Sequence, residues 1–137
     1  PCFTQNTNQS KINIRNLKMN VIEASEQSER VDIPYIDVPV QLDKVVENFP
    51  KDRCLIFCNE VDKKLPMIYD AILKKVDQYN KWAIIIGPEG GFSELESEKI
   101  ATIPSAISVS LGGRILRSDT ATVAAIFSLQ SLVENKK

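Results

Sequence analysis

The sequence predicts an α/β fold built on a mainly parallel β-sheet. Apolar runs of strand length alternate along the 137 residues with segments of helical periodicity, which is typical of this class. The apolar runs are continuous rather than alternating, as expected for strands that are buried on both faces. At this length the chain is expected to form one domain with a core of its own.

The first half of the chain contains two predicted helices and one predicted strand. Residues 1–10 are polar and predict a loop, whereas residues from about 14 to 28 carry apolar side chains on one helical face. A proline keeps residues 33–36 extended, and a short amphipathic helix is expected within 42–49. The apolar run at 54–58 predicts a buried strand.

The second half continues the alternation. A helix is expected from about 66 to 77, followed by a buried strand at 84–86. The next helix is expected from about 93 to 101, and a further strand at 107–111. The final helix is expected from about 119 to 134.

Composition excludes several classes of function. Lys and Arg total 17 against 18 Asp and Glu, so the chain lacks the basic excess of most nucleic-acid binders. Histidine, the commonest general base and metal ligand, is absent, and we expect no metal site. Cys2, Cys54 and Cys58 lack metal-type spacing, which favours buried thiols in a reducing, cytosolic compartment. No apolar run is long enough to cross a membrane.

The stretch that follows the 84–86 strand is expected to organise the domain. Gly90 and Gly91 permit a turn that residues with a Cβ adopt only at a cost. Ser93 and Glu96 have the spacing of a capping box at a helix start. A strand, a glycine-rich turn and a helix at the carboxyl edge of an open sheet form the kind of site that binds ligands.

Three strand ends are expected at this edge, at residues 59–60, 87–91 and 111–119, because parallel strands end on the same side. In the third, Arg114 and Arg117 flank Ile115 and Leu116, and Ser118 or Asp119 is suited to cap the next helix. The apolar pair predicts a wall for an apolar or aromatic ligand, with a guanidinium reaching a phosphate or a carboxylate.

Known short motifs do not identify the ligand. The sequence at 87–91 lacks the lysine and hydroxyl residue of a Walker loop, and its glycine spacing differs from the dinucleotide fingerprint. Residue chemistry alone therefore predicts an α/β domain with a ligand site at one edge of the sheet.

A resemblance to a known family goes further. Residues 86–94, Ile-Gly-Pro-Glu-Gly-Gly-Phe-Ser-Glu, and 111–121, Leu-Gly-Gly-Arg-Ile-Leu-Arg-Ser-Asp-Thr-Ala, resemble the RsmE family of 16S rRNA uracil-N3 methyltransferases in the SPOUT superfamily. Residues 21–30, Val-Ile-Glu-Ala-Ser-Glu-Gln-Ser-Glu-Arg, resemble a further family segment. Many members have proline where Gly113 stands and Thr-Glu at 118–119, and neither difference removes an arginine or a carboxylate.

The resemblance implies a particular architecture and activity. It implies a mainly parallel sheet with helices on both faces and a C-terminal trefoil knot, in a cytoplasmic homodimer. It implies S-adenosylmethionine as cofactor, held by the knot, and the 16S rRNA of the small ribosomal subunit as substrate. Members also have a PUA-like N-terminal RNA-binding domain and a first sheet strand, so we expect residues 1–137 to be the methyltransferase domain without these parts.

The resemblance also implies roles for individual residues. Arg117 is expected to stabilise negative charge on the uracil oxygens, while Glu89, Asp119 or solvent accepts the N3 proton; Glu89 is alternatively a structural residue. The implied cofactor-binding residues are Asn59, Glu60, Gly87, Pro88, Glu89, Gly91, Leu111, Gly112, Arg114, Ile115 and Leu116. The implied substrate-binding residues are Arg114, Arg117, Ser118 and Thr120.

Two alternatives stay open at this point. One is another knotted RNA methyltransferase that acts on a ribose or on a tRNA base. The other is a nucleotide-binding dimerisation module without catalytic activity, which would lack a methyl donor.

Overall fold

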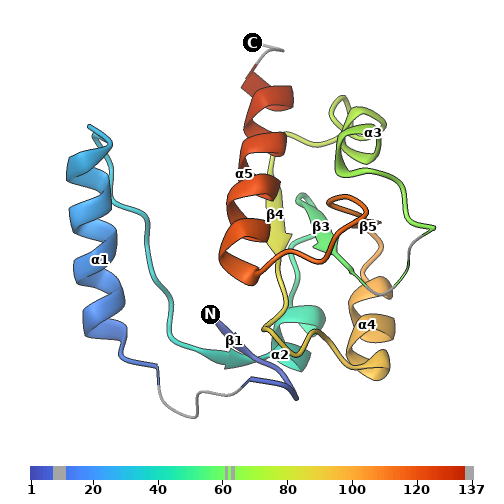
Figure 1. Cartoon of the computed structure of the whole chain (residues 1–137), viewed down its shortest axis with the longest axis horizontal. Coiled ribbons are helices and arrows are strands. Elements are labelled where there is room, and N and C mark those ends of the chain that lie inside the picture. Colours follow the sequence, from blue (N-terminus) through green and yellow to red (C-terminus); the bar gives the residue numbers. More distant parts are fainter. Residues whose placement is uncertain (8–11, 61, 63, 135–137) are drawn as a thin grey trace.

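The domain is an α/β fold with a parallel sheet at its centre, as Figure 1 shows for a computed structural model of the chain. The structure describes residues 1–7, 12–60, 62 and 64–134. In this part of the chain, three strands form the main sheet in the order β4-β3-β5. The strands are β3 (Cys54–Cys58), β4 (Trp82–Ile85) and β5 (Ala106–Val109). The expected class is therefore confirmed.

Both neighbours of β3 run parallel to it. Phe57 lies opposite Ile85 of β4, and Cys58 lies opposite Val109 of β5. The carboxyl ends of the three strands consequently lie at one edge of the sheet, where the loops of interest begin. The prediction that these strand ends share an edge is confirmed.

Side chains of β3 alternate between two hydrophobic cores because successive residues of a strand point to opposite faces. Ile56 and Cys58 belong to one core, and Leu55 and Phe57 belong to the other. All five residues of this strand are buried. A strand that is buried on both faces explains why its sequence is an uninterrupted apolar run.

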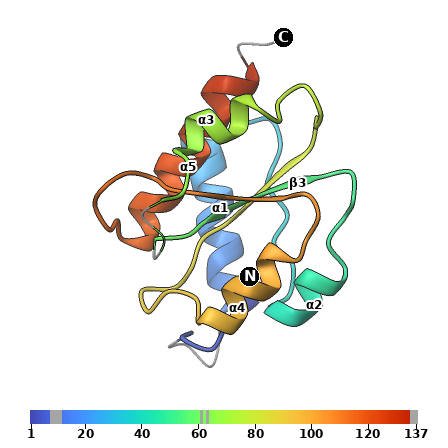
Figure 2. The ribbon, with the colours of Figure 1, turned by 90° about the vertical axis from the view of Figure 1, so that its right-hand side faces the viewer.

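Helices cover both faces of the sheet. Residues of α3 (Ile68–Leu73) and α5 (Ser118–Glu134) pack into the core that contains Ile56. Residues of α2 (Leu42–Glu47) and α4 (Glu94–Ala101) pack into the opposite core. Figure 2 shows the two pairs on opposite sides of β3.

The segment at 14–28 forms α1 (Ile14–Gln27), as predicted. Its first turn is capped by the Asn13 side chain, which accepts a hydrogen bond from the amide of Asn16 at 3.1 Å. The helix stands apart from the sheet in Figure 1, and Met19 is 59% exposed. Its apolar face is therefore only partly covered in this chain.

No helix of the described residues has the length and apolar character needed to cross a membrane.

The first residues differ from the prediction of a loop. Cys2 and Phe3 form β1, which pairs in parallel with β2 (Val40–Gln41). Cys2 packs against the core beneath α2, so burial and pairing together order a segment that has no periodic pattern. Residues 8–10 of the expected loop lie outside the described residues.

The third helix is shorter than the predicted range of 66–77. It ends at Leu73, and the amides of Lys75 and Val76 both donate to the carbonyl of Ile72, each at 2.9 Å. The bond of Lys75 spans three residues instead of the four of a regular α-helix, and the residues after Leu73 continue as turns. The strand predicted at 107–111 likewise ends at Val109.

The start of α4 contains the predicted capping box. The Ser93 hydroxyl accepts a hydrogen bond from the Glu96 amide at 3.3 Å, and a Glu96 carboxylate oxygen accepts one from the Ser93 amide at 2.9 Å. Ser93→Ala is expected to lower the free energy of unfolding by about 1 kcal/mol, because the amide of Glu96 loses the hydroxyl that accepts its hydrogen bond. Urea denaturation measures the change. Ser97→Ala, inside the same helix, is the matched control and should change stability by less than about 0.5 kcal/mol; equal losses would contradict the capping role.

Candidate functional site

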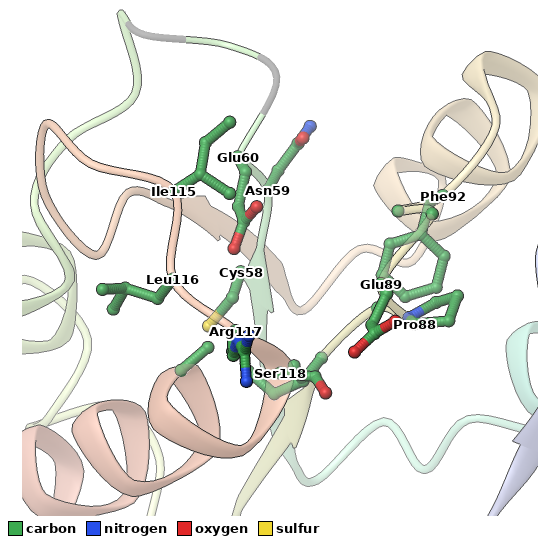
Figure 3. Close-up of a pocket in the computed structure, with 15 residues that line it drawn as sticks. Cys58, Asn59, Glu60, Pro88, Glu89, Phe92, Ile115, Leu116, Arg117 and Ser118 are labelled. Atoms are coloured by element: carbon green, nitrogen blue, oxygen red, sulfur yellow. The ribbon is translucent and has the colours of Figure 1, made fainter.

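The three strand ends meet around one cavity of about 730 Å³ at the carboxyl edge of the sheet (Figure 3). The end of β3 contributes residues 58–60, and the loop after β4 contributes residues 86–92. The loop after β5 and the start of α5 contribute 115–118 and Ala121. The segments that the sequence placed at one edge therefore form a common site.

A second cavity of about 540 Å³ adjoins the first. Glu60, Ile115 and Leu116 line both cavities, so these side chains lie between them. The remaining lining residues of the second cavity are Asp62, Leu65, Met67, Ser110, Leu111, Gly112, Gly113 and Arg114.

Most of the predicted site residues fall into one or both cavities. Those that line the first are Asn59, Glu60, Gly87, Pro88, Glu89, Gly91, Ile115, Leu116, Arg117 and Ser118. Leu111, Gly112 and Arg114 line the second. Asp119 and Thr120 line neither cavity. Their groups bond to each other instead, since a carboxylate oxygen of Asp119 accepts hydrogen bonds from the Thr120 amide at 2.7 Å and hydroxyl at 3.3 Å.

The glycine-rich loop is a closed turn that is fixed to the core. The amide of Gly91 donates to the carbonyl of Pro88 at 2.8 Å, and Gly91 has φ +66°, which favours glycine. A Cβ at Gly87 would lie 3.0 Å from the Phe92 ring, and this ring packs edge-on against Phe57 with centroids 5.3 Å apart. The loop is thus attached to the central strand through an aromatic pair.

The loop after β5 is anchored at its beginning. The Ser110 amide donates to the carbonyl of Pro66 at 2.9 Å, and its carbonyl accepts from the amide of Ile68 at 3.0 Å. Its hydroxyl interacts with the backbone of Gly112 at 3.2 Å. Farther along, Ile115 is 83% exposed and lines both cavities. Ile115 and Leu116 therefore line the cavities where the sequence predicted an apolar wall.

Two arginines at the site have no anionic partner. In the part of the chain that the structure describes, neither Arg114 nor Arg117 takes part in an ion pair. The ion pairs of the described residues lie elsewhere and join Arg30 to Asp32, Lys81 to Asp52, and Lys99 to Asp43. Glu89 lies across the first cavity from Arg117 and Ser118 in Figure 3. Both guanidinium groups are available to a phosphate or a carboxylate.

Cys58 lines the first cavity, although the sequence indicated only a buried thiol. Burial, together with the carboxylate of Glu60, raises the pKa of Cys58 to about 12. The thiol is therefore protonated at neutral pH and contributes an apolar surface rather than a nucleophile. Burial also raises the pKa of Cys54 to about 11, and both cysteines are buried as predicted. Phe92 and Ala121 also line the cavity; both lie inside the motifs at 86–94 and 111–121, but sequence reasoning gave neither of them a role.

No cluster of three or more potential metal ligands occurs among the described residues.

Comparison with known families identifies the domain, because residues 1–130 match the RNA methyltransferase domain family. The chain belongs to this family. The match covers both cavities and all three loops that form them.

Relatives within this RNA methyltransferase family confirm the resemblance to RsmE proteins. The ribosomal RNA small subunit methyltransferase E of Rickettsia conorii is 33% identical over 134 residues, which are 96% of this chain and 52% of that protein. The Bacillus subtilis protein of the same name is 33% identical over 116 residues, covering 82% of this chain and 44% of its own length. The chain thus spans about half the length of these relatives.

Solved structures of methyltransferases share the fold. A candidate methyltransferase from Legionella pneumophila, solved with bound SAM, is 32% identical with a TM-score of 0.72, over 96% of this chain and 54% of that one. Ribosomal RNA small subunit methyltransferase E from Neisseria gonorrhoeae, solved with S-adenosyl methionine, has a TM-score of 0.79 at 23% identity. That match covers 96% of this chain and 54% of the other, and it shows the shared fold.

Two adjacent glycines of the third loop provide a test of its geometry. Gly112 has φ +131°, whereas Gly113 lies outside this region, and a Cβ added at either position would meet nothing beyond its chain neighbours within 4 Å. We expect Gly112→Ala to lower the free energy of unfolding by about 1–3 kcal/mol, because alanine is strained at this φ. Gly113→Ala is the matched control and should be neutral or stabilising by up to about 1 kcal/mol. Thermal unfolding measures both, and equal effects would show that the backbone angle is not the reason for Gly112.

Proposed function

We propose that this chain is the methyltransferase domain of a SAM-dependent enzyme that methylates N3 of a uridine in the 16S rRNA of the small ribosomal subunit. The observation that carries the proposal is the meeting of all three motif-bearing loops around one cavity. The SAM-bound relative from Legionella pneumophila supports the cofactor, and the names of the curated relatives support the substrate. The uridine N3 position is carried by the resemblance to the RsmE family.

The residues of the first cavity fit S-adenosylmethionine. Its volume of about 730 Å³ lies in the range of small-molecule sites. Ile115 and Leu116 offer an apolar wall for the adenine, and the glycine-rich turn brings backbone donors close to the ribose and methionine parts. In the described structure the amides of Glu89 and Gly90 have no hydrogen-bond partner, so they are available to polar atoms of the cofactor.

The cofactor supplies an activated methyl group, and the side chains of this domain position the uracil for in-line attack by N3. Arg117 stabilises the negative charge that develops on the uracil oxygens as the N3 proton leaves. Glu89 is the better-placed proton acceptor, because it lines the cavity and lies across from Arg117. The Asp119 carboxylate lies outside both cavities and accepts hydrogen bonds from Thr120. Arg114 and Ser118 are assigned to contacts with the phosphate backbone of the RNA.

The proposal includes a C-terminal trefoil knot and a cytoplasmic homodimer. The resemblance to the RsmE family carries the knot, and the hydrogen bonds of Ser110 to residues 66–68 hold the end of β5 beside the segment that leads into α3. The outward side of α5 supports the dimer: Val123 is 69% exposed and Phe127 is 70% exposed. A second copy of the chain would remove this apolar surface from water.

Calorimetric titration of the 137-residue chain with S-adenosylmethionine tests the cofactor assignment. We expect a micromolar dissociation constant, because the three loops that carry the motifs all belong to this chain and line one cavity. Free adenosine and free methionine serve as control ligands and should bind more weakly, since each makes only part of the contacts. A folded chain that binds none of them, with neither heat released nor a shift of the melting temperature, would contradict the cofactor site.

Arg117→Ala tests the catalytic assignment in the whole protein. Methyl transfer to small ribosomal subunits should fall by about 100-fold, because one donor to the developing negative charge is removed. The dissociation constant for S-adenosylmethionine should change by less than about threefold, as Arg117 is assigned to the uracil. Lys74→Ala, at the exposed end of α3, is the control and should leave both values unchanged. Loss of cofactor affinity in Arg117→Ala would show that the assigned role is wrong.

A further inference from the structure

We propose that Asn6 is a positioning residue of the first cavity, which holds the turn at residues 88–91 in the conformation that presents its free amides to the ligand. Asn6 does not line the cavity itself and acts through the backbone of the turn. The identity of the ligand rests on the function proposed above. The contact of the Asn6 side chain with the carbonyls of Gly90 and Gly91, the clamp, does not.

The contact joins two segments that are far apart in the sequence. The Asn6 side-chain amide donates hydrogen bonds to the carbonyl of Gly90 at 2.9 Å and to the carbonyl of Gly91 at 3.1 Å. Because both acceptors are carbonyl oxygens, the NH₂ end of the amide must face the turn. One side chain therefore satisfies two successive carbonyl groups.

The shape of the turn matches this contact. A Cβ at Gly90 would lie 3.0 Å from the Cβ of Asn6, so a side chain at position 90 would displace the clamp. Gly91 has nothing within 4 Å of such a position, and its φ of +66° explains the glycine there instead. The two neighbouring glycines thus serve different purposes, and the first of them makes room for Asn6.

Asn6 is itself held by a hydrogen-bonded turn. The Thr7 hydroxyl accepts a hydrogen bond from the Thr4 amide at 3.0 Å, and the Thr7 amide donates to the Thr4 carbonyl at 3.2 Å. The amide of Gln5 donates to a Glu96 carboxylate oxygen at 2.7 Å. Glu96 also belongs to the capping box of α4. Residues 4–7 are therefore bonded to the turn through Asn6 and to the start of α4 through Glu96.

The clamp determines which backbone groups of the loop remain available. Asn6 fixes the carbonyls of Gly90 and Gly91, and the Gly91 amide is bonded to Pro88. Within the described residues this leaves the amides of Glu89 and Gly90 without partners, and both residues line the cavity. Since two glycines have wide conformational freedom, an unclamped turn would spend part of its time with carbonyl oxygens in place of these donors.

The test compares Asn6→Asp with Gln5→Ala in the 137-residue chain. Aspartate has nearly the same shape as asparagine, but it places a carboxylate oxygen against two carbonyl oxygens and removes the donor. Gln5 contacts Glu96 through its backbone amide, which alanine retains, so Gln5→Ala is a matched control in the same turn. The measurements are the hydrogen-exchange rate of the Gly91 amide by NMR and the dissociation constant for S-adenosylmethionine by calorimetry.

Asn6→Asp is expected to accelerate exchange of the Gly91 amide and to raise the dissociation constant by about tenfold, as expected for the loss of one exposed and one partly buried hydrogen bond. In the whole protein it should raise KM for S-adenosylmethionine while leaving kcat at saturating cofactor largely unchanged. Gln5→Ala should leave all of these values as in the unchanged chain. If Asn6→Asp does not fold, Asn6→Ala replaces it, with smaller effects in the same direction.

Unchanged exchange and unchanged affinity in the folded Asn6 variants would overturn the proposal. Accelerated exchange without any effect on affinity would also overturn it, because the clamp would then be merely structural. If the unchanged chain does not bind S-adenosylmethionine at all while the Asn6 variants still accelerate exchange, the cofactor assignment fails and the clamp on the turn holds.

Discussion

The arrangement of this domain depends on the hydrogen bonding of β3 to parallel partners along both of its edges. With β4 on one side and β5 on the other, all three strands end in the same direction. Helices cover the two faces, so the loops that follow the strands extend beyond one edge of the sheet. The cavities there follow from this topology, and the loop sequences decide what the cavities bind.

Much of the fold was predictable because its signals are local. The apolar run at 54–58 indicated a strand buried on both faces, and Ser93 with Glu96 indicated the start of α4. The meeting of the three loops followed from the parallel direction of the strands. By contrast, β1 has two residues and no periodic pattern, and the end of α3 depends on which amides share the carbonyl of Ile72.

Other features of the site depend on distant contacts, which a sequence pattern does not show. Asn6 lies in a polar segment, and its importance appears only when residues 90–91 are placed beside it. Likewise, helical periodicity did not predict that Asp119 and Thr120 lie outside both cavities. Adjacent glycines look equivalent in the sequence, but the structure separates Gly90, which admits a neighbour, from Gly91, which adopts a positive φ.

The contact between Asn6 and Gly90 joins residues that are 84 positions apart. A chain that emerges from the ribosome in order cannot close this contact until residues 90–91 have been synthesised. Contacts of such long range form slowly, because much chain entropy is lost before they contribute. The turn therefore acquires its final shape late in folding, and a nascent chain has no competent binding site to offer before its sheet is assembled.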